Sequence, residues 1–343
     1  MKITFLFGAG ASANVLPTVN RMTEALENFS NLIESEFEAS DDILVSSLGI
    51  KKNKAKKQVL ADFEWLKQSS LNHSSIDTFA KKLYLTGNTR DLHTLKSALD
   101  LFFTVQQLLN GIDFRYDLFY STILQRGEHN TIDLPNNVNC LTWNYDIQLE
   151  LAATGFFNIQ SPNEIERVLN IVPFVDNRGP YSDKFAIVKL NGTASGRIRG
   201  NKFDRLKLDL SLFGAKLSSD DRKEIIDSCI REYVRSKEFD NNIPSLMFAW
   251  ENDPLSITTR EFAKSMVRTT EILVVIGYSF PNFNREIDKI LLTSMPNLNK
   301  IIIQSADQKS IDIISQRIKS LSPGDYQTES YVETNDFFIP FEF

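Results

Sequence analysis

MKITFLFGAGASANVLPTVNR, residues 1–21, joins an apolar strand to a turn of small residues. Residues 2–7 are rich in β-branched and aromatic side chains, a composition that predicts a buried strand. GAGASA, residues 8–13, follows at once, and its glycines let the backbone turn sharply and let a phosphate or sugar approach closely. A helix beginning near Ser12 would direct free N–H groups at that anion. Such turns also serve plain packing of a strand on a helix, so this stretch alone leaves nucleotide binding and packing as equal alternatives.

Composition and charge describe an ordinary globular protein with an acidic balance. The 343 residues are 42% hydrophobic and 24% charged, enough for one large α/β domain or two smaller ones. A net charge of −6 argues against a broad surface for nucleic acid. The apolar run at the N-terminus is too short for a signal peptide, and no stretch is long enough to cross a bilayer. Cys140 and Cys229 lie far apart, so a reduced, cytoplasmic location is the simplest interpretation.

Beyond residue 21 the pattern is first helical and then alternates between strands and helices. Residues 22 to about 128 carry apolar side chains at helical spacing and occupy the place of the second strand of an ordinary dinucleotide-binding domain. Strands are expected at the start of residues 138–146 and at 185–190, 245–250, 272–276 and 300–304, and helices at 147–153, 259–270, 285–294 and 309–321. This alternation predicts an α/β fold with a doubly wound parallel sheet. We expect a single domain over residues 1–343, with a mainly helical module at 22–135 and a second charged helical excursion at 197–240.

Polar residues follow two more of the expected strands. TWNYD, residues 142–146, ends one strand and leads into a helix. Ligands bind at the carboxyl ends of strands in open α/β sheets, and the Asn144 amide can orient a water or a sugar hydroxyl there. Asp146 would lie near the helix N-terminus, where capping is the favoured role and catalysis the alternative. The strand at residues 185–190 ends in Asn-Gly, residues 191–192.

Four strand ends together resemble the sirtuin fold. In chain order they are GAGASA (8–13) with Pro17 and Thr18 behind it, TWNYD (142–146), KLNG (189–192) and GYS (277–279). The chain is more similar to the prokaryotic sirtuin-like branch than to the protein deacylases, and Tyr145 is typical of sirtuin-like NAD+-degrading proteins. The similarity spans residue 3 to about residue 320. It implies a Rossmann-like sheet with a large helical insertion, and NAD+ as the substrate.

The resemblance also implies which residues form the site. Those that match the segments contacting NAD+ are Gly8, Ala9, Gly10, Ser12, Ala13, Pro17, Thr18, Arg21, Thr142, Gly192, Gly277, Tyr278 and Ser279. Arg21 lies one position later than the family's arginine. Asn144 and Asp146 match positions beside the nicotinamide ribose, and with Asn191 they are the implied catalytic residues.

Two departures from the family pattern bear on the chemistry. The deacylases carry a four-cysteine zinc module after this segment, whereas residues 192–244 contain only Cys229, so no structural zinc of that kind is expected. Asn191 stands where the family has histidine. That histidine acts as a base on a ribose hydroxyl, and an amide cannot accept a proton near neutral pH.

Two functions of different classes are open to such a chain. The favoured one is an NAD+ glycohydrolase (NADase) that cleaves NAD+ to nicotinamide and ADP-ribose, in bacterial antiphage defence by NAD+ depletion. The alternative is a catalytically weakened or silent module that binds NAD+ or ADP-ribose as a sensor or scaffold. A protein deacylase and a hydride-transferring dehydrogenase rank below both. By family analogy we expect a homo-oligomer or a partner defence protein. The aromatic tail, residues 331–343, is expected to dock on its own domain or on a neighbouring subunit.

Overall fold

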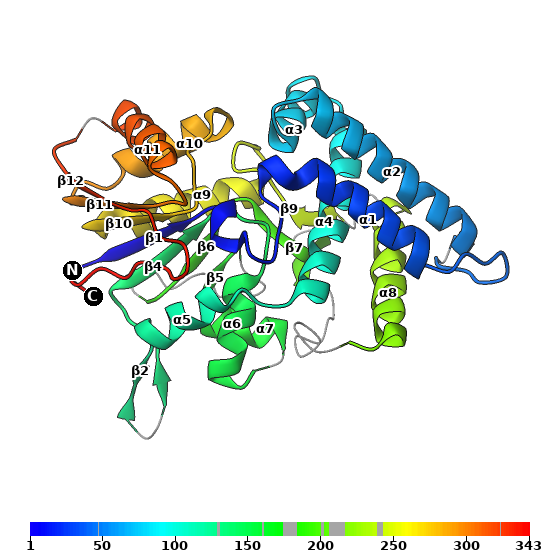
Figure 1. Ribbon diagram of the computed structural model, residues 1–343, viewed down its shortest axis with the longest axis horizontal. Coiled ribbons are helices and arrows are strands. Elements are labelled where there is room, and N and C mark those ends of the chain that lie inside the picture. The colour runs from blue at the N-terminus through cyan, green and yellow to red at the C-terminus, as the bar shows by residue number, and fades with distance from the viewer. Residues whose placement is uncertain are drawn as a thin grey trace. The chain divides into compact units, whose positions relative to one another are not determined.

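The computed structural model describes residues 1–46, 48–128, 131–159, 161–173, 184–199, 202–205, 217–238, 243–322 and 324–343 (Figure 1). The chain divides into two compact units. Unit 1 comprises Met1–Ala13, Ile112–Gly192 and Met247–Phe343, and unit 2 comprises Asn14–Gly111 and Thr193–Leu246.

Unit 1 is built on a parallel sheet. Its strands are β1 (Ile3–Phe7), β4 (Val138–Thr142), β5 (Ile171–Val172), β6 (Ile187–Lys189), β10 (Ile272–Ile276), β11 (Lys300–Gln304) and β12 (Gln327–Tyr331). Within the described residues, these seven strands form one sheet in the order β12-β11-β10-β1-β4-β6-β5, and each neighbouring pair is parallel. The central strands β1 and β10 are buried along their whole length because their apolar residues face helices on both sides. The predicted doubly wound α/β fold is confirmed.

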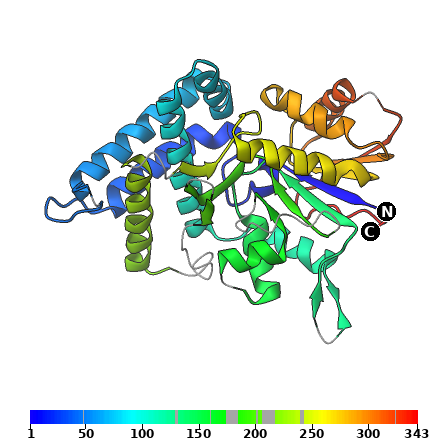
Figure 2. The same ribbon diagram turned by 180° about the vertical axis from the view of Figure 1, so that it is seen from behind.

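Helices cover both faces of this sheet (Figures 1 and 2). They are α5 (Phe114–Ile123), α6 (Gln148–Phe157), α7 (Pro162–Val168), α9 (Pro254–Met266), α10 (Arg285–Thr293) and α11 (Gln308–Leu321). Side chains of α9, α10 and α11 form one apolar core with the side chains that β1, β10 and β11 direct to that face. On the opposite face, the Phe119 ring of α5 packs edge-on against Phe5 at 5.0 Å and against Phe7 at 5.6 Å. Part of the high phenylalanine content therefore forms an aromatic layer of the core.

Unit 2 is mostly helical. Its elements are α1 (Met22–Glu36), α2 (Lys52–Asn72), α3 (Ile76–Leu85), α4 (Thr89–Asn110), α8 (Ser219–Glu238), and the strands β7 (Gly192–Arg199), β8 (Lys202–Arg205) and β9 (Ile243–Leu246). The Phe29 ring lies 4.7 Å from Phe63 and 5.4 Å from Phe102, so α1, α2 and α4 share an aromatic core. The α3 helix begins with a capping bond, in which the Ser75 hydroxyl accepts from the Thr78 amide.

Several elements differ from the sequence-based expectations. The helical excursion expected at 197–240 begins with strands. An antiparallel strand pair is formed by residues 192–199 and 202–205, and the helix of the excursion is α8. Residues 200–201, 206–216 and 239–242 lie outside the described residues. The strand expected at 245–250 ends at Leu246 and pairs in a three-stranded sheet with β7. The edge strand β12 was not expected, because its side chains are exposed or half-buried and carry no apolar pattern.

The aromatic tail docks on unit 1, one of the two places expected for it. The Gln304 side chain donates to the carbonyl oxygens of Glu333 at 2.7 Å and Asp336 at 2.6 Å. Phe337 is 6% exposed, and its ring lies 5.5 Å from that of Phe7. Among the described residues, none of the helices is long and apolar enough to cross a membrane.

Candidate functional site at the carboxyl edge of the sheet

The ends of three neighbouring strands define the site. β1 lies between β4 and β10, and Phe7, its last residue, pairs with Thr142 on one side and with Ile276 on the other. From β1 the chain continues toward β4, whereas from β10 it continues toward β11 on the opposite side. The boundary between β1 and β10 is therefore the topological switch point, where open α/β sheets bind ligands (Figure 1).

Small residues at this switch point allow two strand ends to touch. The Gly8 amide donates to Ile276 O, and the Gly10 amide donates to Gly277 O, both at 3.0 Å. A Cβ on Gly8 would lie 2.5 Å from Tyr278 Cα, and one on Gly10 would lie 2.8 Å from Gly277 Cα. Close backbone packing therefore requires these glycines, which is the second of the two alternatives that the sequence left open. Their role in holding a phosphate stays a prediction.

The loop after β1 does not open an α-helix. Ala9–Ser12 forms a four-residue 3-10 helix, followed by Ala13 as its C-terminal cap. The Ser12 hydroxyl lies 1% exposed at the end of this helix. The loop thus delivers one buried hydroxyl to the carboxyl edge of the sheet through a 3-10 helix, in place of the helix expected from the sequence near Ser12.

Ser12 is the centre of a hydrogen-bonded group at this edge. Its hydroxyl donates to Asp146 Oδ2 at 2.8 Å and lies 2.9 Å from the Tyr116 hydroxyl. The Asn144 amide nitrogen donates to Gly8 O at 3.0 Å and to Ser12 Oγ at 3.4 Å. Because a serine hydroxyl has one proton, its bond to Asp146 makes Ser12 the acceptor from Tyr116 and Asn144. We call Ser12, Tyr116, Asn144 and Asp146 the edge cluster.

The edge cluster contains one carboxyl group, that of Asp146. It is 7% exposed, and its other oxygen accepts from the Gln148 amide at 3.2 Å, near the start of α6. Burial raises the pKa of this carboxyl, while nearby Lys189 and the Ser12 hydrogen bond act in the opposite direction. Asp146 therefore bonds the first turn of α6 with one carboxyl oxygen and the Ser12 hydroxyl of the loop after β1 with the other. A buried carboxyl with a perturbed pKa at a strand end is typical of functional sites.

Asn191 is held by the backbone on both sides of its amide. Its nitrogen donates to Trp143 O at 3.0 Å, and its oxygen accepts from the Ala249 amide at 3.2 Å. Its main-chain oxygen accepts from the Met247 amide at 3.0 Å. Asn191 thus joins the end of β6 to the segments that follow β4 and β9.

Two buried ion pairs support the site. Lys189, 1% exposed, bonds Glu150 Oε1 at 2.7 Å and also donates to the main-chain oxygen of Asp146. Arg115 pairs with Asp113 at 2.6 Å and donates to the carbonyl of Ala11 at 2.9 Å. The first pair fixes the backbone that carries Asp146, and the second fixes the loop that carries Ser12.

The other sequence-predicted residues occupy a range of positions. Thr142 Oγ1 accepts from the Asn144 amide at 3.0 Å, and Trp143, next in sequence, stacks on Tyr278 at 5.5 Å. Ser279 is exposed. Three predicted residues, Pro17, Thr18 and Arg21, belong to unit 2, in or beside the 3-10 helix Val19–Arg21. Gly192 is the last residue of the second segment of unit 1.

Sequence reasoning missed Tyr116 and Arg115. Tyr116 meets Ser12 across a separation of 104 residues, and Arg115 reaches Ala11 across the same separation. Both lie in the first turn of α5, a segment without a motif, so no spacing rule or other sequence signal connects them to the first loop.

No protein-family model matches this chain, and no curated protein matches it. Among solved structures, that of Sir2Tm bound to a propionylated peptide is similar, with 12% identity and a TM-score of 0.39 over 97% of this chain and 88% of that chain. Within the described residues, no group of three or more His, Cys, Asp or Glu side chains is arranged to hold a metal ion. Functional assignment therefore depends on this chain's own residues.

Proposed function

We propose that this protein is an NAD+ hydrolase whose site is the carboxyl edge of the unit 1 sheet. The observation that carries the proposal is the edge cluster, in which the loop after β1 and the segment after β4 meet through Ser12, Asn144 and Asp146. The sheet and its switch point support nucleotide binding in general. The resemblance of the four strand-end motifs to sirtuins is what suggests NAD+ as the nucleotide.

In the proposed reaction, water adds to C1′ of the nicotinamide ribose as the bond to nicotinamide breaks. The bonding electron pair leaves with nicotinamide, which becomes neutral, and the water loses one proton to give ADP-ribose. The transition state has oxocarbenium character, which positioned dipoles and a carboxylate stabilise. The Asn144 amide nitrogen is engaged, while its oxygen makes no hydrogen bond with any described residue and is available to orient the water. Ionised Asp146 accepts the proton.

Asn191 has a positioning role in this proposal. Both polar atoms of its side chain bond main-chain groups, so it orders the strand ends that surround the ribose. This arrangement is also the observation that favours the second candidate, a module that binds NAD+ or ADP-ribose without cleaving it, because no strong base occupies the position of the family histidine.

The experiment measures NAD+ consumption by the full chain, by Asp146→Asn and by Asn191→His. Loss of a general base lowers turnover by about 10²–10⁴-fold, so we expect that loss in Asp146→Asn. The rate of the parent chain should rise as the pH increases through the raised pKa of Asp146, and this dependence should disappear in Asp146→Asn. Glu164→Gln, an equivalent change at an exposed carboxylate of α7, is the control.

One result distinguishes the hydrolase from the binding module, namely whether bound NAD+ is recovered intact. Saturable NAD+ binding with the nucleotide recovered intact, for both the parent chain and Asn191→His, would support the binding module and exclude the hydrolase. Absence of NAD+ binding by every variant would exclude both candidates.

We further propose that the hydrolase acts in the bacterial cytoplasm, as a homo-oligomer or with a partner defence protein, and depletes NAD+ during phage infection. Depletion of a shared cofactor requires control, and that requirement is the physical reason for an assembly. The test is to measure cellular NAD+ after phage challenge in cells that express the parent chain or Asp146→Asn. Equal NAD+ levels in the two strains would refute this role.

A further inference from the structure

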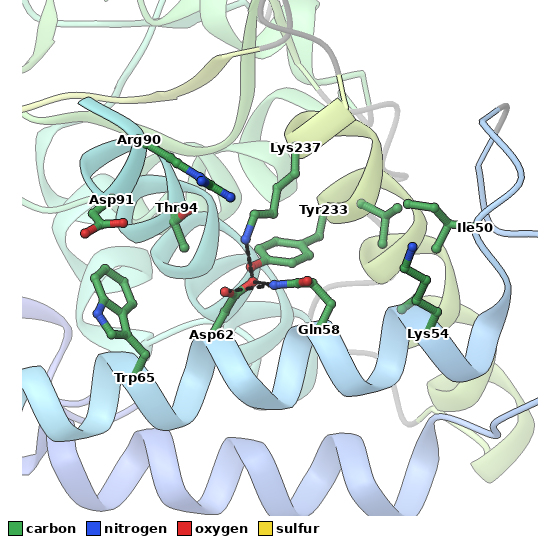
Figure 3. Close-up of a pocket in the computed structure, with 12 residues that line it drawn as sticks. Ile50, Lys54, Gln58, Asp62, Trp65, Arg90, Asp91, Thr94, Tyr233 and Lys237 are labelled. Carbon is green, nitrogen blue, oxygen red and sulfur yellow. Dashed lines mark hydrogen bonds and ion pairs between the residues drawn. The ribbon is translucent and has the colours of Figure 1, made fainter. Parts of the chain in front are cut away.

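An open pocket of about 460 Å³ lies within unit 2 (Figure 3). One face of α2 contributes Lys54, Gln58, Asp62 and Trp65 to its lining. The first turns of α4 contribute Arg90 and Thr94, and the end of α8 contributes Tyr233 and Lys237. At 1.5 Å per residue, the α2 side of the pocket extends about 16 Å from Lys54 to Trp65. This volume is in the range of small-molecule sites, about 300–1,000 Å³.

The negative charge at the centre of this pocket is already compensated. Asp62 Oδ2 accepts from the Lys237 ammonium and from the Tyr233 hydroxyl, both at 2.5 Å. The Gln58 amide donates to the same oxygen at 3.0 Å. Figure 3 shows these three side chains converging on Asp62. Because its hydrogen-bonding capacity is largely used by the protein, Asp62 is a structural anchor and repels an anionic ligand only weakly.

Two cations of the lining are uncommitted. Lys54 and Arg90 are exposed, and neither makes a hydrogen bond or ion pair with any described residue. The second carboxylate of the lining, Asp91, is bonded by the Asn88 amide at 2.7 Å at the start of α4. The lining thus holds three cations, counting Lys237, and two carboxylates with protein partners. Arginine binds phosphate oxygens with paired N–H donors, so this lining favours a phosphate group.

Trp65 adds an aromatic surface to the same pocket. Its ring packs edge-on against Phe79 at 5.5 Å, with an interplanar angle of 62°, and the side chain is only half-buried. In Figure 3 the indole rises from α2 into the pocket on the side opposite Lys54. A partly exposed indole held at its edge is a stacking surface for a planar base.

We propose that this pocket binds a nucleoside phosphate, with the base against Trp65 and the phosphate at Arg90. The cationic side chains and the indole are the two components that such a ligand requires. The pocket belongs to unit 2, whereas the edge cluster belongs to unit 1. The proposal therefore does not depend on NAD+ hydrolysis.

The test is calorimetric titration of the full chain with ADP and, separately, with inorganic pyrophosphate. Arg90→Ala should weaken ADP binding at this site about tenfold or more, since charge-assisted hydrogen bonds to phosphate are lost, and Arg90→Lys should recover part of the affinity. Trp65→Ala should also weaken ADP binding, about tenfold, and leave pyrophosphate binding unchanged. The control is Lys57→Ala, an exposed lysine of α2 that does not line the pocket.

Asp146→Asn distinguishes ADP binding in this pocket from ADP binding at the edge of the unit 1 sheet. It should leave the ADP binding that depends on Arg90 unchanged. The absence of ADP binding at millimolar concentration would overturn the proposal. Equal ADP binding by the parent chain, Arg90→Ala and Arg90→Glu would overturn it too, as would an equal loss of binding in Lys57→Ala. Pyrophosphate binding as tight as ADP binding, with no effect of Trp65→Ala, would show a simple anion site and would also overturn it.

Discussion

Replacement of Gly277 by alanine should destabilise the protein, since two independent costs act at this position. Gly277 follows β10 with a φ of +63°, a region that L-residues rarely adopt. A Cβ there would lie 2.4 Å from Ala11 N and 2.5 Å from Gly10 C. Both of these atoms belong to the backbone, so neither can move aside by a change of rotamer.

The two costs can be estimated separately. The left-handed conformation costs a non-glycine residue about 1–2 kcal/mol, and overpacking costs about 1–3 kcal/mol. The sum, roughly 2–5 kcal/mol, is a large part of a typical stability of about 5–15 kcal/mol. At about 2–4 °C per kcal/mol, the melting temperature should fall by roughly 4–20 °C.

Gly87→Ala is the matched control. Gly87 has a similar φ of +70°, but a Cβ there would have no atom within 4 Å. It should therefore show the conformational cost alone, about 1–2 kcal/mol. The assay is urea denaturation of both variants and the parent chain, followed by circular dichroism. Equal destabilisation by the two substitutions would show that the contact between the two strand ends contributes nothing, and would refute the packing role of the switch-point glycines.

Three further substitutions test the core of unit 1, each by urea denaturation. Burial raises the pKa of Asp288 well above 3.8, so the native state holds a proton that the unfolded state releases. Stability should therefore fall as the pH rises from about 4 through the raised pKa. Asp288→Asn should make this fall less steep, and an unchanged pH dependence would refute a raised pKa at Asp288. Lys189→Met removes the buried ion pair between Lys189 and Glu150 and should cost about 3–5 kcal/mol. Part of this loss should be recovered when Glu150→Gln is added, and no recovery would contradict the pairing. Phe337→Ala should cost about 3–5 kcal/mol, whereas Phe341→Ala, at a position 97% exposed, should cost almost nothing; equal effects would refute docking of the tail.

The parallel sheet was predictable from sequence where strands are buried on both faces. Residues 272–276 and 300–304 are apolar, β-branched runs between turn residues, and the structure has strands at the same positions. β12 was not predictable, because an edge strand with exposed side chains lacks that pattern. The strands β7 and β8, at 192–199 and 202–205, have a charged sequence without an alternating apolar pattern, so they are recognised by their pairing and not by their composition.

The candidate site was predictable to the level of strand ends and no further. The resemblance implied that Asn144 and Asp146 belong to the same candidate site as residues 8–13, and both bond Ser12. The sequence could not show that Gly8 meets the backbone of Tyr278. It also could not show that the Asn191 amide bonds main-chain groups. Each of these contacts depends on which strands become neighbours, and that information is carried by the topology of the whole chain.

The position of β1 has a consequence for synthesis of the protein. Ile3 pairs with Ile272, 269 residues later along the chain, and with Val138 on its other side. At about 5–20 residues per second, a ribosome needs roughly 13–54 s to proceed from Ile3 to Ile272. During that interval the buried central strand β1 lacks its neighbour β10 and exposes unpaired N–H and C=O groups along that edge. The nascent chain should therefore depend on chaperone protection until β10 emerges.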